Sequence, residues 1–366
     1  MDFKIAILPG DGIGPEVIAE SVKILKIIGK KYGHSFDLYN GIIGGVAIDE
    51  FANPIPNETL SIIEKSDAIL FGAVGGPKWD DPDAKIRPED GILFLRKSLN
   101  LFANLRPIKI FPSLINTSPI KPELLNGVDI IVVRELTGGL YFGTPKKRWS
   151  TSKGRKAVDT LIYSESEIKR ILKIAFQLAL VRNKKLTSVD KANVLETGRL
   201  WRQIATEMSI DYPDIELEHI LVDNASMQII QNPNKFDVIV SENTFGDILT
   251  DEASILSGSM GMIPSASLSS LNNNIKSRNT KPSLYEPIHG TAPDIAGKGI
   301  ANPIGMILSV ALMLNYSFGL KKEADAINNS VESVLSLGYR TKDIVSTGNK
   351  PLSTSKMGDM IKDHIE

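Results

Sequence analysis

Cysteine is absent from all 366 residues of the chain, which excludes disulfide bonds and thiolate metal sites. The absence fits a reducing compartment, so we expect a cytoplasmic protein. It also means that redox chemistry in this chain would depend on a cofactor.

An excess of either charge and a long hydrophobic run are also missing. The 42 basic residues nearly balance the 43 acidic ones, so we expect no nucleic-acid or membrane partner, and any anion binding must be local. The most apolar segment, 303–314, is far shorter than the ~20 residues that span a bilayer, and it predicts a buried helix. The first residues, MDFKIAILPGDG, lack a signal-peptide pattern and predict a strand.

The hydrophobic pattern is typical of an α/β protein. Apolar runs such as FKIAIL, DAILFGAV, VDIIVV and FDVIV alternate with longer helical patterns, and the chain length suggests two domains. Strands that are apolar throughout are buried on both faces, which predicts mainly parallel sheets flanked by helices. The segment at about 137–157 mixes glycine, aromatic and basic residues and predicts an extended hairpin or arm, and 268–283 predicts a polar surface loop.

Two carboxylates, Asp247 and Asp251, follow the run FDVIV at a spacing of four. A helix that starts near Gly246 would place both on one face, where their repulsion could be offset by a divalent cation with oxygen ligands. Alternatively, they are solvated residues of a helix start, where acidic groups complement the helix dipole and Asp247 caps the helix. These residues alone leave both interpretations open.

Two glycine-rich stretches are candidates for nucleotide binding. LPGDGIGPE is one residue short of the G-x-G-x-x-G fingerprint, which favours a glycine turn with Pro15 opening the next helix. Near the end of the chain, YEPIHGTAPDIAGKGIANP supplies backbone that can approach a ligand closely, with Asp294 and Asn302 available for a ribose and a base edge. By itself this second stretch could be only a turn-rich loop.

Basic and acidic side chains also stand where apolar runs end. Arg134 directly follows VDIIVV, and Asp223 and Lys191 follow two further runs, at the sheet edge where α/β proteins bind ligands. Arg96 and Arg106 add guanidinium groups that match carboxylates. Lys191, among small and apolar residues, is a candidate general base. Taken singly, Arg96, Arg106 and Lys191 could each be a solvated surface residue.

Together these stretches resemble the β-decarboxylating (isocitrate/isopropylmalate) dehydrogenases over nearly the whole chain. The resemblance is carried, in the order of the family, by LPGDGIGPEV, VGGPKW, LRKSLNLFANLRP, VRELTGGLYFG, VDKANVLETGRLWR, VDNASMQ, FGDILTDEAS, GSMGMIPSASL and HGTAPDIAGKGIANP. It implies a homodimer of two-domain α/β chains with the site in the interdomain cleft. The first domain would be 1–101 plus 258–366, with both termini and the loops for NAD, which is bound without a Rossmann motif. The second, 102–257, would hold the dimer interface, the metal site and the arm.

The resemblance also implies roles for particular residues. Arg96, Arg106 and Arg134 would bind the malate carboxylates, and Asp247 and Asp251 would bind Mg²⁺ or Mn²⁺ together with Asp223 of the partner subunit, which also contacts substrate. Lys191 of the partner subunit would be the base and Tyr141 the acid, although Tyr141 could equally be a packing residue. The implied NAD contacts are Ile13, Gly75, Gly76, Glu89, His289, Gly290, Thr291, Ala292, Asp294, Ile295 and Asn302.

The implied substrate follows from the family's substituent-recognition positions, which hold Glu89, Ile92 and Leu93 here. Ile92 and Leu93 suit an isopropyl group, whereas a third carboxylate would lose water there without gaining donors. The expected reaction is the NAD-dependent oxidative decarboxylation of 3-isopropylmalate to 4-methyl-2-oxopentanoate and CO₂ in leucine biosynthesis. Tartrate, D-malate and homoisocitrate remain alternative substrates. A catalytically silent regulatory subunit is a further alternative, but it should have lost site residues that this chain retains.

Overall fold

The computed structural model describes residues 1–81, 83–271, 281–346 and 348–365. Strands alternate with helices, and most strand pairs are parallel, which confirms the predicted α/β class. The chain divides into two compact units: unit 1 is Met1–Leu101, Lys109–Asn126 and Ser254–Glu366, and unit 2 is Phe102–Ile108 and Gly127–Ala253. Residues 109–126 therefore lie in unit 1, whereas the predicted boundary places them in the second domain.

The strands of unit 1 follow the order β2-β1-β3-β12-β11, in which β11 and β12 pair antiparallel and the other neighbouring strands pair parallel. Their bounds are β1 (Asp2–Gly10), β2 (Ser35–Asn40), β3 (Ala68–Ala73), β11 (Pro264–Leu268) and β12 (Ser283–Pro287). β3 is buried along its whole length, as expected for a strand covered on both faces. The loop predicted between β11 and β12 falls largely on 272–280, which lie outside the described residues.

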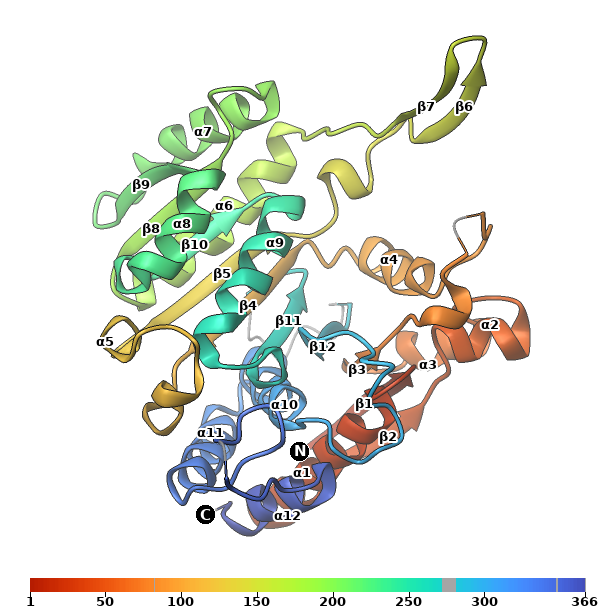
Figure 1. Ribbon diagram of the computed structural model, residues 1–366, viewed down its shortest axis with the longest axis vertical. Helices are drawn as coiled ribbons and strands as arrows, with labels where there is room; N and C mark the ends of the chain where they lie inside the picture. Colours follow the sequence, from red (N-terminus) through yellow and green to blue (C-terminus); the bar gives the residue numbers. More distant parts are fainter. Residues whose placement is uncertain (82, 272–280, 347, 366) are drawn as a thin grey trace. The chain divides into compact units, whose positions relative to one another are not determined.

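The helices of unit 1 include a buried one at the position of the most apolar segment of the sequence. This helix, α10, packs against β11 and β12 and contacts α1, which in turn packs on α12 (Figure 1). A proline in the first turn of α1 starts that helix, as the glycine–proline pattern predicted. The helices are α1 (Gly14–Tyr32), α2 (Gly45–Phe51), α3 (Asn57–Glu64), α4 (Pro88–Ser98), α5 (Pro122–Leu125), α10 (Ile304–Tyr316), α11 (Lys321–Ser336) and α12 (Thr354–Asp363).

The strands of unit 2 follow the order β4-β5-β10-β8-β9. Their bounds are β4 (Ala103–Lys109), β5 (Asp129–Glu135), β8 (Lys185–Asp190), β9 (Glu216–Leu221) and β10 (Val238–Ser241). β10 lies parallel between β5 and β8, and β8 is parallel to β9, so the carboxyl ends of these four strands meet at one edge. This edge of the sheet is where the candidate site lies.

Four helices and a hairpin complete unit 2. α6 (Glu165–Val181) and α7 (Glu196–Ser209) pack against each other and the sheet, and α8 (Val222–Gln231) and α9 (Asn243–Ser254) follow β9 and β10. Ser164 and Glu167 form a capping box at the start of α6. Strands β6 (Lys147–Thr151) and β7 (Gly154–Val158) pair antiparallel into a hairpin that stands away from the sheet of its own unit (Figure 1).

Within 1–81, 83–271, 281–346 and 348–365, no helix is both long and apolar enough to cross a bilayer.

Candidate active site

The carboxyl-end edge of the unit 2 sheet carries several of the residues singled out from the sequence. The register pairs Arg134 of β5 with Ser241 of β10, and Lys191 directly follows β8. Asp223 is the second residue of α8, which begins where β9 ends. Ligands of open α/β sheets bind at such an edge, because loops and helix starts leave the sheet there.

Helix α9 presents Asp247 and Asp251 from this edge. The helix begins at Asn243, three residues before the predicted start near Gly246. The alternative in which Asp247 caps the helix is wrong: the Glu242 carboxylate accepts a hydrogen bond from the Phe245 N–H at 2.9 Å, and Asp247 lies inside the helix. Both aspartates are therefore left with no capping role, one turn apart on the same face.

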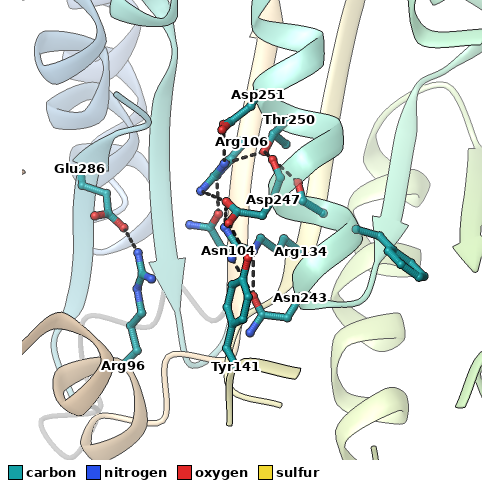
Figure 2. A network of polar contacts seen from close by, with 12 residues as sticks. Arg96, Asn104, Arg106, Arg134, Tyr141, Asn243, Asp247, Thr250, Asp251 and Glu286 are labelled. Carbon is teal, nitrogen blue, oxygen red and sulfur yellow. Dashed lines mark hydrogen bonds and ion pairs between the residues drawn. The ribbon is translucent and has the colours of Figure 1, made fainter. Parts of the chain in front are cut away.

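Asp247 accepts hydrogen bonds from an arginine and from Tyr141, the candidate acid. Its Oδ1 accepts a hydrogen bond from Arg134 Nη1, and its Oδ2 accepts one from the Tyr141 hydroxyl at 3.1 Å (Figure 2). Arg134 is 3% exposed, and its guanidinium carbon lies 5.9 Å from the centre of the Tyr141 ring. Burial and the Asp247 charge raise the pKa of Tyr141, so its hydroxyl keeps its proton at neutral pH.

Arg106 provides a second buried guanidinium to the same face of α9. Its Nη2 lies 3.5 Å from Asp247 Oδ1, and its Nη1 lies 3.7 Å from Asp251 Oδ1. Asn104 accepts a hydrogen bond from Nε at 2.8 Å and Thr250 accepts one from Nη1 at 2.5 Å, which fixes the plane of the group (Figure 2). Burial raises the pKa of the Asp251 carboxyl, and the Arg106 charge works against this shift.

The pair Asp247 and Asp251 fits a divalent cation in chemistry but is not a complete ligand set. Two carboxylates one helical turn apart supply the hard oxygen ligands that Mg²⁺ and Mn²⁺ take. Among the residues that the structure describes, no three His, Cys, Asp or Glu side chains gather in an arrangement that could hold a metal. Within one chain, therefore, these two carboxylates would need further oxygen ligands from elsewhere.

Lys191 and Asp223 pair with each other at the adjoining strand ends. Lys191 Nζ donates to Asp223 Oδ1 at 2.6 Å, and the side chain of Asp223 is 62% exposed. This hydrogen bond holds the pKa of the Asp223 carboxyl below its usual value. The pair is thus a charged, accessible group at the surface of unit 2 rather than a core element.

Arg96 lies in unit 1, on α4, and has a partner that the sequence did not suggest. Its Nη2 donates to Glu286 of β12 at 2.9 Å, and both side chains are largely buried (Figure 2). The two residues are separated by 190 positions, so only the fold reveals the contact. Glu286 holds the Arg96 guanidinium in place at the carboxyl end of α4.

The segments expected to bind NAD lie together in unit 1. The Ile13 N–H donates to the Thr291 carbonyl at 2.9 Å, which joins the first glycine turn to the late glycine-rich loop. The buried Asp11 carboxylate accepts hydrogen bonds from the N–H groups of Gly45 and Gly75 at 2.7 and 2.9 Å. Asp11 therefore fixes the loop that carries Gly75, a function that the sequence alone did not predict.

Two features of this region suit a bound ligand. His289 Nε2 is buried and has no hydrogen-bond partner among the described residues, and burial lowers the pKa of this imidazole. A Cβ on Gly75 would lie 2.8 Å from Glu89 Oε1, and a Cβ on Gly290 would meet open space. Asp294 is exposed, whereas Asn302 is buried and donates to Asp343 at 2.9 Å while accepting the Ile304 N–H.

The two apolar specificity residues differ in exposure. Ile92 is 6% exposed and belongs to the hydrophobic core of unit 1 with Leu95 and Leu99. Leu93 is half-buried and has surface left for a ligand. Of the two, Leu93 is therefore the better candidate for direct contact with a substrate substituent.

The chain is similar to known dehydrogenases over nearly its whole length. Residues 4–361 match the family model described as isocitrate/isopropylmalate dehydrogenase. The 3-isopropylmalate dehydrogenase of Dehalococcoides mccartyi is 57% identical over 99% of this chain and 98% of its own length, and that of Halalkalibacterium halodurans is 52% identical over 100% and 98%. The crystal structure of isocitrate dehydrogenase from Methylococcus capsulatus superposes with a TM-score of 0.85 at 33% identity, with 99% of both chains covered. The chain belongs to the isocitrate/isopropylmalate dehydrogenase family of oxidoreductases.

Proposed function

We propose that this chain catalyses the oxidative decarboxylation of 3-isopropylmalate to 4-methyl-2-oxopentanoate and CO₂, with NAD as the hydride acceptor, in leucine biosynthesis. The observation that carries the proposal is a network in which two buried arginines and a protonated tyrosine contact the two carboxylates on one face of α9. The names and high identity of the relatives support the same reaction.

The arginines are proposed to bind the substrate dianion. Arg106 and Arg134 are almost fully buried, so their planar donor groups are held at fixed angles and lose little freedom when they bind carboxylates. Arg96, held by Glu286, would supply the third guanidinium. Donor groups fixed in this way act as orienting clamps for a reacting 2-hydroxy acid.

Asp247 and Asp251, with Asp223 of the partner subunit, are the residues that would hold Mg²⁺ or Mn²⁺. When bound, such a cation supplies Lewis-acid stabilisation of the negative charge that develops on the substrate oxygen. Asp247 also accepts a hydrogen bond from the Tyr141 hydroxyl, so the same carboxylate orients the proposed acid.

Proton transfer is assigned to Lys191 and Tyr141. Lys191 of the partner subunit, in its neutral amine form, would accept the hydroxyl proton as hydride leaves carbon for NAD, and the C–C bond to the departing carboxylate would then break with release of CO₂. Tyr141, which keeps its proton at neutral pH, would protonate the carbon left behind. One proton is taken from oxygen and one is delivered to carbon, so the overall reaction neither releases nor consumes a proton.

A homodimer is part of the proposal, with Lys191 and Asp223 serving the partner's site. The hairpin β6–β7 is exposed on both faces and carries Trp149 at 40% exposure. An isolated two-stranded hairpin is marginally stable in water, which favours its burial against a second copy of the chain. The accessible Lys191–Asp223 pair can likewise supply the ligand and base that one chain's α9 lacks.

The substrate is tested by the rate of NADH formation from 3-isopropylmalate, homoisocitrate, D-malate and tartrate. We expect kcat/KM for 3-isopropylmalate to exceed the others by about tenfold or more, because an apolar surface rejects a substituent whose polar groups it cannot pair. If the efficiency is higher with one of the other three acids, that acid replaces 3-isopropylmalate as the proposed substrate, and the proposed catalytic roles are unchanged.

Tyr141→Phe is expected to slow carbon protonation by about 10²–10⁴-fold, the usual contribution of a positioned acid. Hydride transfer should fall much less, because the hydroxyl is not required for that step. The measurement compares substrate oxidation with decarboxylation of the supplied β-keto acid. Tyr212→Phe is the matched control, since the Tyr212 ring stacks on Phe176 in the same unit. Equal losses in the two half-reactions would show that Tyr141 has a packing role.

Cofactor choice is expected to depend on Asp294, which can accept from a ribose 2′-hydroxyl but would repel a 2′-phosphate. The double variant Asp294→Lys, Ile295→Tyr should shift the ratio of NAD to NADP efficiency toward NADP by about tenfold or more, as a change of about 1.4 kcal/mol would do. Asp325→Lys on α11 makes the same charge change elsewhere in unit 1 and should leave the ratio unchanged. An unaltered ratio in the double variant would place the adenosine ribose away from this loop.

A further inference from the structure

Asn243, the first residue of α9, makes a set of contacts that nothing in the proposed mechanism yet uses. It is 1% exposed, and its side-chain oxygen accepts hydrogen bonds from Arg134 Nε at 3.1 Å and Nη2 at 2.7 Å. Its side-chain nitrogen donates to the Gly138 carbonyl at 3.1 Å. One amide therefore connects β5 to the segment that leads into Tyr141.

The orientation of this amide follows from its partners. Arginine can only donate and a carbonyl can only accept, so the oxygen must face Arg134 and the nitrogen must face Gly138. Two donors of the guanidinium on one oxygen fix the plane of the group. The remaining Nη1 is thereby directed to Asp247 (Figure 2).

The contact with Gly138 fixes the tyrosine by a separate route. Gly138 immediately precedes the 3-10 turn Gly139–Tyr141, and its own N–H donates to buried Glu135 at 2.8 Å. Gly139 has a positive φ of 74°, so this turn depends on backbone that few residues adopt. With the Gly138 N–H and carbonyl both held, the direction in which Tyr141 leaves the turn is fixed.

The main chain of Asn243 is anchored independently of its side chain. Its N–H donates to the Tyr163 hydroxyl at 3.0 Å, and the neighbouring Glu242 caps α9. A change of the side chain therefore leaves the start of the helix in place. Because Asn243 is almost completely buried, it acts through Arg134 and Tyr141 rather than by touching a ligand.

We propose that Asn243 is the positioning residue that sets Arg134 for substrate binding and Tyr141 for proton delivery at the same time. This inference rests on the proposed function, which assigns those roles to Arg134 and Tyr141. A single residue would thereby couple the substrate-binding group to the group that completes the reaction.

The first test is a double-mutant cycle on substrate affinity, with 3-isopropylmalate as the probe, titrated into the NAD-free protein with Mn²⁺. Asn243→Leu is expected to weaken binding by about tenfold to a hundredfold, because buried charge-assisted hydrogen bonds contribute on that scale. In an Arg134→Gln background, Asn243→Leu should cause no further loss. Ser241→Ala is the matched control, since Ser241 Oγ is buried two residues away and lacks a partner in the described chain.

The outcomes separate this inference from the function on which it rests. If Arg134→Gln leaves affinity unchanged, the proposed function fails. If Arg134→Gln weakens binding but Asn243→Leu does not, only the positioning role fails. Equal losses from Asn243→Leu in both backgrounds, with a matching fall in Tm, would mean a purely structural role and would also overturn the inference.

The second test isolates Tyr141 with Asn243→Asp, which keeps an oxygen for Arg134 but has no donor for the Gly138 carbonyl. We expect a smaller loss of affinity than in Asn243→Leu, together with a fall in kcat of about tenfold that disappears in a Tyr141→Phe background. If Asn243→Leu does not fold, Asn243→Asp carries both comparisons. A kcat loss that persists undiminished in the Tyr141→Phe background would remove the link to the tyrosine.

Discussion

Asp251→Asn is expected to lower divalent-cation-dependent turnover by roughly 10²–10³-fold, because one carboxylate ligand becomes a neutral amide and several kcal/mol of charge stabilisation depend on the cation. The fold should survive, since the Asp251 side chain is about half exposed and lies 3.7 Å from Arg106 Nη1. The measurement is initial rate against Mn²⁺ concentration, with thermal unfolding recorded on the same samples.

The neighbouring Glu252 offers a matched control for this variant. Glu252→Gln makes the same change of charge on the same helix, but Glu252 accepts from Ser226 at 3.0 Å and lies outside the arginine network. It should keep its activity and its response to Mn²⁺. Full activity of Asp251→Asn, or of the unaltered protein after treatment with a chelator, would rule out the metal assignment.

Lys191→Ala is expected to be inactive by itself and to recover when mixed with Asp251→Asn. Each proposed site takes Lys191 from one chain and Asp251 from the other, so a mixed dimer contains one intact site and one site with both lesions. With random exchange of subunits about half the dimers are mixed, and recovery should approach roughly a quarter of the wild-type rate under two-fold symmetry.

The experiment exchanges subunits by mild denaturation and refolding, and the mixed species is quantified with a tag on one chain. Lys191→Ala refolded with itself is the control, and it should stay inactive because neither of its sites has a base. No recovery in samples that contain mixed dimers would show that each chain builds its own site, with Lys191 and Asp251 acting together.

The central strands of the fold could be predicted from the sequence because they are buried on both faces. β3, β5 and β10 each contain a continuous apolar run, and the burial of these runs leaves little choice of structure. The edge strand β2 alternates between partly buried and exposed residues, which weakens its signal. β4 contains Arg106 and Pro107, whose burial depends on neighbours that the local sequence does not identify.

The start of α9 was misplaced for a related reason. A glutamate is an uncommon helix cap, so Glu242 gave no signal for a start at Asn243, and the glycine at 246 suggested a later one. The spacing of Asp247 and Asp251 was still sufficient to place both carboxylates on one face.

The sequence named the charged residues of the candidate site, but it gave no sign of the residues that hold them in place. The Arg134–Asn243 contact spans 109 positions, and it exists only because β5 and β10 are neighbours in the sheet. Asn104 is close to Arg106 in sequence but carries no pattern of its own. A resemblance to a family transfers the reactive residues, whereas the supporting hydrogen bonds require the fold.

The proposed reaction is tested most directly by measuring all its products in one incubation of 3-isopropylmalate with NAD and Mn²⁺. Equal amounts of NADH, CO₂ and 4-methyl-2-oxopentanoate are predicted, because each hydride transfer is followed by one decarboxylation and one protonation. NADH formed without CO₂ would mean that the protein is an alcohol dehydrogenase without decarboxylating activity. The absence of NADH would contradict the proposed reaction itself.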